Sequence, residues 1–203
     1  MARYAFFEGA IVPLEEAKIS VQTHAFLYGT AVFEGIRAYW SEDEQDLLIF
    51  RMPEHYQRLL NSCKILQITP DYSLDDLCRI TIELLANNND REDVYIRPVF
   101  YKSHIGVGVQ LAGLADDFLV FSVPMGPYLD LDKGLRVKVT SWRHINDNAI
   151  PMRAKVNGAY VNAALAKSDA VLDGYDEAIF LTADGHVSEG SAENLFIVRK
   201  GEL

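Results

Sequence analysis

Two stretches late in the sequence decide the fold: Arg153-Ala-Lys-Val-Asn-Gly-Ala-Tyr160 and Ser188-Glu-Gly-Ser-Ala-Glu-Asn-Leu-Phe196. Lys155 follows Pro151 and comes just ahead of an alanine-rich run that favours a helix ending near Gly174. The first turn of a helix carries partial positive charge, and this charge together with burial favours a neutral, nucleophilic amine. Lys155 is therefore a candidate nucleophile or base, although an arbitrary lysine is most often a surface residue.

The second stretch supplies carboxylates. Glu189 and Glu193 bracket small residues that let the backbone approach a ligand and leave N–H groups to point at an anion. One predicted helix and one predicted strand separate Glu189 from Lys155, and in an α/β layer this spacing returns the chain to one cleft. A lysine amine, the Tyr160 hydroxyl and a carboxylate are what pyridoxal phosphate requires, to form an imine, bind the ring oxygen and hold the ring nitrogen protonated.

Five separated motifs resemble, in the same order, those of the class IV, or fold type IV, pyridoxal-phosphate aminotransferases. Within that class the sequence looks most like the branched-chain amino acid aminotransferases, and the resemblance runs from about Phe6 to the last residue. The motifs are Tyr28-Gly-Thr-Ala-Val-Phe-Glu-Gly-Ile-Arg37, His55-Tyr-Gln-Arg-Leu59, Tyr95-Ile-Arg-Pro98, Lys155-Val-Asn-Gly-Ala-Tyr160 and the stretch from Ser188 to Phe196.

The resemblance implies an α/β (α+β) fold in two domains. Residues 1–122 would form the smaller N-terminal α/β domain, and residues 123–133 would form the interdomain loop. Residues 134–203 would begin the larger domain that binds the cofactor. Family members continue beyond a segment like Phe196–Leu203, and their later part binds the phosphate and the substrate α-carboxylate. We therefore expect a fragment that binds the cofactor poorly by itself.

The resemblance also implies an activity and a set of roles. The amino group of leucine, isoleucine or valine would pass to 2-oxoglutarate, giving 2-oxo acids and glutamate, through a Schiff base of pyridoxal 5′-phosphate on the catalytic Lys155. A homodimer or higher homo-oligomer is implied, because in the family the Tyr28 loop crosses to the neighbouring subunit. The implied cofactor contacts are Arg58, Lys155, Tyr160 and Glu189. The implied substrate contacts are Tyr28, Phe33, Tyr95, Arg97, Met125 and Tyr128, with Met125 where relatives often have tryptophan.

The residues taken alone leave alternatives open. Taken alone, Arg58 is predicted to be a solvated helix residue and Arg97 to belong to a structural ion pair, since charged side chains are usually exposed or paired. D-amino acid aminotransferases and aminodeoxychorismate lyases share the lysine and the glutamate but lack the Tyr95-Ile-Arg-Pro98 segment. In a non-enzymatic α/β binding module, Lys155 and Glu189 would form a salt bridge.

Composition is typical of a cytoplasmic enzyme. The 203 residues carry a net charge of −10, which argues against nucleic-acid binding. No apolar run approaches the roughly 20 residues of a membrane span, and no signal peptide opens the sequence. Cys63 and Cys78 fall at apolar helical positions, which predicts reduced thiols rather than a disulfide or metal site.

Local patterns predict the remaining elements. A hairpin turns at Glu8-Gly9, and one strand buried on both faces is expected over Thr30–Trp40, where Glu34 and Arg37 need charged partners. Pro53 opens one helix, and a capping box of Ser73 and Asp76 opens the next. Pro98 predicts an edge strand or a bulge. The other strands are expected at Leu47–Phe50, Val94–Tyr101, Phe118–Val123, Leu135–Trp142, Glu177–Leu181 and Asn194–Arg199.

Overall fold

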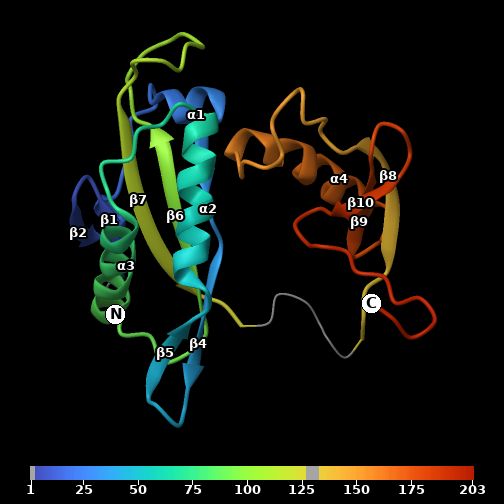
Figure 1. Cartoon of the computed structure of the whole chain (residues 1–203), viewed down its shortest axis with the longest axis horizontal. Helices are drawn as coiled ribbons and strands as arrows, with labels where there is room; N and C mark the ends of the chain where they lie inside the picture. The colour runs from blue at the N-terminus through green and yellow to red at the C-terminus, as the bar shows by residue number, and fades with distance from the viewer. Residues whose placement is uncertain (1–2, 127–132) are drawn as a thin grey trace. The chain divides into compact units, whose positions relative to one another are not determined.

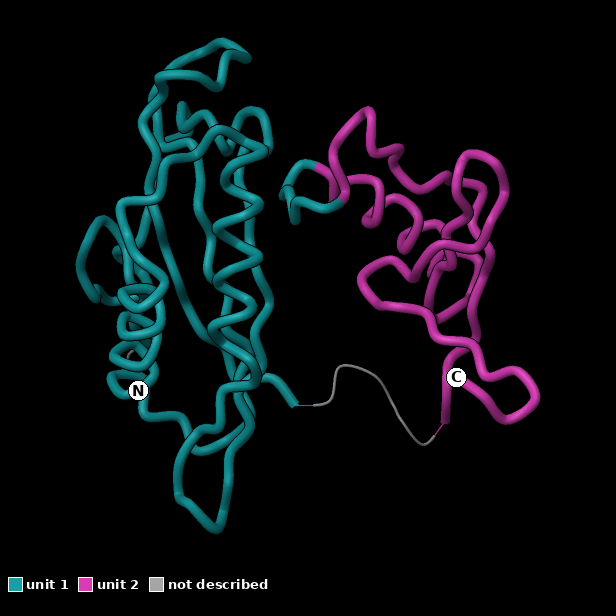
Figure 2. Tube along the Cα trace, in the orientation of Figure 1, with its two compact units in different colours: residues 1–128, 153–158 teal, residues 129–152, 159–203 magenta. Residues whose placement is uncertain are grey.

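The computed structural model describes residues 3–126 and 133–203, and the chain divides into two compact units. Unit 1 comprises Met1–Tyr128 with Arg153–Gly158, and unit 2 comprises Leu129–Met152 with Ala159–Leu203 (Figure 2). The segment that carries Lys155 thus groups with unit 1, whereas the domain predicted over residues 134–203 includes it. Most of the expected interdomain loop lies outside the described residues, so that boundary stays a prediction.

The elements follow one another along the chain as strands with few helices between them (Figure 1). Unit 1 contains β1 (Tyr4–Phe7), β2 (Ala10–Pro13), the 3₁₀ turn η1 (Leu14–Glu16), α1 (His24–Tyr28), β3 (Ala31–Phe33), β4 (Ile36–Ser41), β5 (Asp46–Ile49), α2 (Met52–Ile65), α3 (Leu74–Asn88), β6 (Val94–Lys102) and β7 (Asp116–Pro124). Unit 2 contains β8 (Val137–Arg143), α4 (Tyr160–Leu172), β9 (Glu177–Leu181) and β10 (Val187–Gly190), and the 3₁₀ turn η2 (Asn157–Ala159) leads into α4.

Unit 1 is built on a seven-stranded sheet in the order β2-β1-β7-β6-β4-β5, with β3 also paired to β6. The predicted hairpin is confirmed, with Phe7 opposite Ala10. β6 is the central strand, antiparallel to β7 along its whole length and to both β3 and β4 on its other side. The backbone of β6 therefore pairs with segments from both earlier and later parts of the sequence.

The single strand expected over Thr30–Trp40 is wrong, because β3 ends at Phe33 and β4 begins at Ile36. At the break Gly35 approaches β6 closely, since a Cβ at this position would lie 2.5 Å from the Tyr95 hydroxyl oxygen. The Glu34 N–H donates to the Pro98 carbonyl at 3.1 Å. In an antiparallel ladder the N and O of one residue point toward the same neighbouring strand, so the position where Pro98 lacks an N–H faces this break. The proline therefore leaves no strand hydrogen bond unmade, and β6 is not an edge strand.

Two amphipathic helices pack on this sheet. α2 contacts α3 and β3, while α3 contacts β1 and β7. The predicted capping box is confirmed: the Ser73 hydroxyl accepts from the Asp76 N–H at 3.2 Å, and the Asp76 carboxylate accepts from the Ser73 N–H at 3.1 Å. Fully buried side chains from the helices and the central strands form the core, among them Tyr56, Leu59, Leu77, Leu84, Ile96, Phe100 and Phe118.

The two cysteines are free thiols. Cys63 on α2 is fully buried, and this burial raises the pKa of its thiol to about 12. The thiol therefore stays protonated and packs as a small apolar group.

Unit 2 is a small β–α–β arrangement. β8 runs parallel to β9, β10 is antiparallel to β9, and α4 packs on β8 and β9. The helix predicted from the alanine-rich run is confirmed, and small side chains let it approach the sheet closely: Ala166 and Ala170 are buried against Ala178 and Phe180. In the part of the chain that the structure describes, no helix is long and apolar enough to cross a membrane.

The strand expected at Asn194–Arg199 is wrong. β10 occupies Val187–Gly190 instead, and Phe196 and Ile197 are 72% and 66% exposed. A strand needs a partner backbone along its length, and among the described residues this segment has only the isolated bridge of Arg199 with Glu202. The apolar pattern alone therefore did not make a strand.

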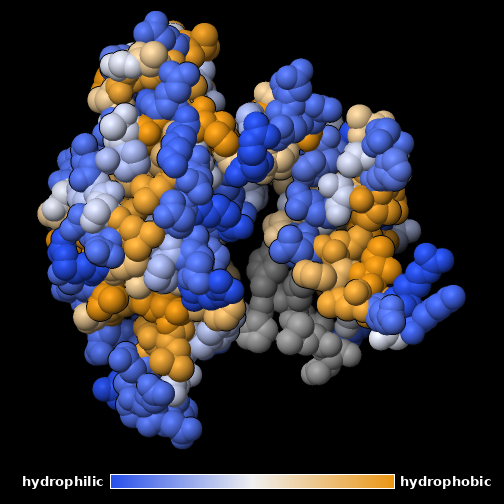
Figure 3. All heavy atoms as spheres, in the orientation of Figure 1, coloured by the Kyte–Doolittle hydropathy of each residue, from blue (hydrophilic) through white to orange (hydrophobic). Residues whose placement is uncertain are grey.

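The surface of unit 1 carries both apolar and polar side chains (Figure 3). Figure 3 shows apolar side chains over the base of the β4–β5 hairpin and polar side chains at its tip. The apolar part includes Leu48 and Phe50, which are 47% and 59% exposed.

Candidate functional site

The main chain of Lys155 is fixed from two sides within unit 1. Its carbonyl accepts from the Phe33 N–H of β3 at 3.0 Å, and its N–H donates to the Ser62 hydroxyl of α2 at 3.4 Å. Val156 forms an isolated antiparallel bridge with Val32. The main chain of Lys155 is thus held by β3 and α2.

A contact between two glycines completes this docking. The Gly158 N–H donates to the Gly29 carbonyl at 3.1 Å, and Gly29 ends α1 in the left-handed conformation with φ +67°. A Cβ on Gly29 would lie 2.7 Å from the Gly158 Cα. Only glycine satisfies both the positive φ and the close approach.

Gly29→Ala should therefore loosen the Lys155 segment. We expect roughly 1–2 kcal/mol of left-handed strain, plus roughly 1–3 kcal/mol for the close contact, in the free energy of unfolding. Gly113→Ala is the matched control, because Gly113 has φ +75° but, among the described residues, no neighbouring atom within 4 Å of the point where its Cβ would stand. Urea unfolding measures both variants, and equal losses would show that the glycine contact does not hold the segment.

An aromatic and cationic cluster lies beside the lysine. The Lys155 amine is 5.1 Å from the centroid of the Phe33 ring, and the Arg97 guanidinium is 4.1 Å from the same centroid. Arg97 also lies 5.1 Å from the Tyr95 ring, two positions earlier on β6. These distances fall within the range of cation–π attraction. The structure thus brings together four of the residues singled out from the sequence.

One hydrogen-bond donor of the Arg97 side chain, Nε, has unusual surroundings. Its Nε is buried and has no hydrogen-bond partner among the residues that the structure describes. The ion pair considered for Arg97 from the sequence alone is not seen there. A buried, unsatisfied guanidinium nitrogen is costly, and this is the kind of group that a ligand oxygen satisfies.

Arg58 is held by a buried carboxylate. Its Nε and Nη2 donate to the two oxygens of Glu34 at 2.5 and 2.7 Å, and the His55 Nδ1 lies 2.9 Å from Glu34 Oε2. Burial by itself would raise the pKa of Glu34, but the hydrogen bonds from His55 and Arg58 outweigh it and hold the pKa below its usual value. The carboxylate is therefore charged at neutral pH, and the charged partner expected for Glu34 is Arg58.

The other two predicted cofactor contacts belong to unit 2. Tyr160 is the first residue of α4. Glu189 lies in β10, and its Oε1 is 2.6 Å from the Nε2 of His144. His144 is not among the residues predicted from the sequence, because nothing in the spacing of His144 and Glu189 indicates that the fold brings them together.

The turn after Glu189 differs from the expectation. Its N–H groups were expected to be available to an anion, but Gly190 N donates to the Glu193 carbonyl at 2.9 Å and Ala192 N donates to the Glu193 carboxylate at 3.0 Å. Glu193 thus uses two of these donors internally. The N–H groups of Gly190 and Ala192 are therefore already hydrogen-bonded within the turn.

Three further predicted substrate contacts have separate surroundings. The Tyr28 hydroxyl accepts from the Gly108 N–H at 3.0 Å, and the Tyr28 ring contacts the His24 ring at an interplanar angle of 50°. Met125 follows β7, is half-buried, and donates its N–H to the Asp93 carbonyl at 2.9 Å. Tyr128 lies outside the described residues. The functional roles of all these residues stay predictions.

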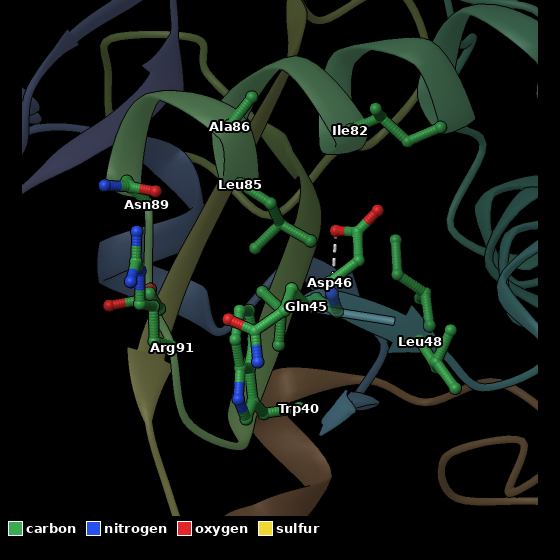
Figure 4. A pocket seen from close by; sticks show the side chains of 12 residues that line it. Trp40, Gln45, Asp46, Leu48, Ile82, Leu85, Ala86, Asn89 and Arg91 are labelled. Carbon is green, nitrogen blue, oxygen red and sulfur yellow. Dashed lines mark hydrogen bonds between the residues drawn. The ribbon is translucent and has the colours of Figure 1, made fainter. Parts of the chain in front are cut away.

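A pocket of about 590 Å³ lies elsewhere in unit 1, between the β4–β5 hairpin and the end of α3 (Figure 4). Trp40, Leu48, Ile82, Leu85 and Arg91 are among the residues that line it. Of the predicted site residues that the structure describes, none lines this pocket. The candidate site is therefore the Lys155 cluster and not the pocket.

Comparisons with known proteins point to one family. The model of the family described as amino-transferase class IV matches residues 31–203. A probable branched-chain-amino-acid aminotransferase of Aquifex aeolicus (strain VF5) is 51% identical over 199 residues, which are 98% of this chain and 64% of the relative. This chain therefore spans about two thirds of the length of that curated relative.

Solved structures agree. The branched-chain aminotransferase of the archaeon Thermoproteus uzoniensis, crystallised with norvaline, has a TM-score of 0.94 and 40% identity, covering 99% of this chain and 67% of that one. The branched-chain amino acid aminotransferase of Thermobaculum terrenum, in its PLP form, has a TM-score of 0.91 and 35% identity over 98% of this chain and 65% of its own. The predicted two-domain fold of type IV is confirmed by this likeness. The chain belongs to the class IV aminotransferase family.

Proposed function

We propose that the full-length protein is a branched-chain amino acid aminotransferase that uses pyridoxal 5′-phosphate. It moves the amino group of leucine, isoleucine or valine to 2-oxoglutarate. The observation that carries the proposal is the Lys155 amine, held by backbone contacts beside Phe33 and within the same cluster as Arg97. The family match and the names of the Aquifex and Thermobaculum proteins support the substrate class and the cofactor.

The donor set fits the cofactor. A primary amine is needed for the covalent link, and Lys155 supplies it on a fixed backbone. A phosphate needs a cation with directed donors, and Arg58 supplies a guanidinium whose orientation is set by Glu34. When bound, pyridoxal phosphate would draw electrons from the substrate α-carbon and make its proton removable.

The residues then have separate roles. Lys155 would hold the cofactor, and its amine would serve as general base and acid for the proton of the substrate α-carbon. Arg58 would bind the phosphate, and the Tyr160 hydroxyl would donate to the phenolic oxygen of the ring. Glu189 would hold a proton at the ring nitrogen. His144, hydrogen-bonded to Glu189, orients that carboxylate.

The substrate side chain would meet an apolar wall with one cation. Phe33, Tyr95, Met125 and Tyr128 are proposed to line the side-chain pocket, and Tyr28 is proposed to contribute from a neighbouring subunit. Arg97 is proposed to bind the γ-carboxylate of glutamate or 2-oxoglutarate. Its buried, unsatisfied Nε and its place over the Phe33 ring support a charged ligand at this point.

The test of the proposed function begins with the cofactor. The full-length protein is incubated with pyridoxal phosphate and reduced with borohydride, and the modified peptide is identified by mass spectrometry. A pyridoxyl group on Lys155 is expected. Without it, the alternative of a non-enzymatic binding module, in which Lys155 is structural, would replace the proposal.

A substrate comparison then separates the class IV activities. Amino transfer to 2-oxoglutarate is measured with L-leucine and with D-alanine, and release of pyruvate from aminodeoxychorismate is measured in parallel. Turnover is expected with L-leucine. Turnover with D-alanine alone, or lyase activity alone, would assign the protein to another member of the class.

Arg97→Ala should separate the two kinds of substrate. It removes a charge-assisted contact worth roughly 1.5–3 kcal/mol, or about 10- to 150-fold in affinity, for glutamate and 2-oxoglutarate. Leucine has no side-chain carboxylate, so its half-reaction should be largely spared. Single-turnover spectroscopy gives kcat/KM for each half-reaction.

The control for this variant is Arg79→Ala, since Arg79 is an exposed arginine on α3 that pairs with nearby acids of the same helix. It should leave both half-reactions unchanged. Equal losses for leucine and glutamate in Arg97→Ala would mean that Arg97 supports the fold or binds the α-carboxylate.

We also propose a cytoplasmic homo-oligomer. The free thiols support a reducing compartment. Phe26 and Leu27, just before Tyr28 on α1, are 65% and 41% exposed and support an interface on this helix.

A further inference from the structure

The carboxylate of Glu34 is a costly group to place where β3 and β4 separate. Its side chain is fully buried, and both oxygens accept hydrogen bonds from residues of α2. His55 and Arg58 are three positions apart on that helix, so their side chains leave the same face. These hydrogen bonds link the break between β3 and β4 to the first two turns of α2.

Stability alone does not account for this arrangement. A buried ion pair seldom repays the desolvation of its charges, and apolar residues of similar volume often serve the fold as well. Here only the carboxylate is buried, while the Arg58 side chain is 57% exposed. A buried anion thus holds an exposed guanidinium in one orientation. An anion that binds Arg58 then meets a side chain that has already lost its rotamer freedom.

The same cluster is connected to Lys155 through two routes. Along the strand, Phe33 N donates to the Lys155 carbonyl at 3.0 Å, and the next residue, Glu34, holds Arg58. Along the helix, the buried Ser62 hydroxyl donates to the Arg58 carbonyl at 3.1 Å and accepts from Lys155 N at 3.4 Å. These contacts form a closed circuit that fixes the amine-bearing residue relative to the guanidinium-bearing residue.

We propose that Glu34 is a positioning residue, which sets the Arg58 guanidinium for the phosphate of a ligand whose carbonyl carbon meets Lys155. The His55 Nδ1, which lies 2.9 Å from Glu34 Oε2, keeps the carboxylate directed at Arg58. The inference rests on the proposed function, in which Arg58 binds the cofactor phosphate. Glu34 acts through Arg58, since its own side chain has no exposed surface.

Glu34→Gln tests the proposal, because glutamine keeps the shape of the side chain but removes its charge. Dissociation constants for pyridoxal phosphate and for pyridoxal, which lacks the phosphate, are measured by absorbance titration of the full-length apoprotein. Affinity for pyridoxal phosphate should fall about 10-fold or more, as for a weakened charge-assisted contact. Affinity for pyridoxal should stay at the wild-type value.

A double-mutant cycle shows whether Glu34 acts through Arg58. Arg58→Ala should itself weaken the binding of pyridoxal phosphate, and adding Glu34→Gln to it should cause no further loss. Two independent losses that multiply would overturn the proposal.

Asp116→Asn is the matched control. Asp116 pairs with the buried Lys102 at 2.8 Å in the same sheet and accepts from the Thr69 N–H at 2.9 Å. This variant should keep the wild-type ratio of the two affinities even if the protein is less stable. If Glu34→Gln does not fold, Glu34→Asp is compared with the same two ligands, because it keeps the charge but shortens the side chain.

Equal losses for pyridoxal phosphate and pyridoxal in the Glu34 variant would make Glu34 a structural residue and overturn this inference alone. A wild-type protein that binds neither ligand would instead overturn the proposed function. The two failures are therefore distinguishable.

Discussion

Lys155→Ala is expected to abolish transamination while unit 1 stays folded. The contacts that hold the segment use the main chain of Lys155, through Phe33 N and the Ser62 hydroxyl, and alanine keeps both. The variant loses the side chain beyond Cβ, and with its amine go both the proposed covalent attachment and the group that would move the α-proton. Turnover of leucine with 2-oxoglutarate should fall by about 10⁴-fold or more, the upper end of general acid–base catalysis alone.

Lys64→Ala provides the comparison for this variant. Lys64 lies on α2 in the same unit, is exposed, and donates to the Asn61 side chain at 3.0 Å. Its replacement should change neither turnover nor the unfolding temperature. Near-wild-type turnover in Lys155→Ala, measured on a preparation with normal thermal unfolding, would refute the assignment of this lysine.

Glu189→Gln is expected to slow removal of the α-proton by about 10²-fold or more, as for other lost electrostatic contacts to a reacting system. The carboxylate is proposed to hold a proton at the ring nitrogen, and glutamine cannot do so. Glutamine has nearly the same size and still accepts a hydrogen bond from His144, so the tie between β10 and the end of β8 survives. Stopped-flow absorbance with leucine and α-deuterated leucine measures the step.

Glu193→Gln is the control, because this neighbouring carboxylate accepts from Ala192 N within its own turn. It should leave the proton-transfer rate unchanged. If Glu189→Gln and Glu193→Gln gave the same rates and the same isotope effects as the wild type, Glu189 would be structural and the partner of the ring nitrogen would have to be another residue.

Local patterns determined much of the fold. The hairpin at Glu8-Gly9, the capped start of α3 and the alanine-rich α4 depend on residues that are close in the sequence, so propensity and capping chemistry were sufficient. The family motifs also indicated the lysine and the arginine of the candidate site. These features require little knowledge of distant segments.

Patterns failed where a partner decides the outcome. Apolar residues at Asn194–Arg199 resemble a strand, yet a strand forms only beside another backbone. The run from Thr30 to Trp40 resembles one strand, but contacts with Tyr95 and Pro98 of β6 interrupt it at Glu34-Gly35. In both cases the deciding atoms lie far away in the sequence.

The sequence by itself determined the family and most of the elements, and it singled out Lys155 as the candidate for the reactive amine. Only the tertiary structure decided that Glu34 binds Arg58, that Gly29 contacts Gly158, and that His144 is hydrogen-bonded to Glu189. Each pair joins segments from different elements, and the pairing depends on strand register and helix packing. A buried carboxylate needs partners, which the residue type predicts, but which partner it finds depends on which backbones the folded chain brings together.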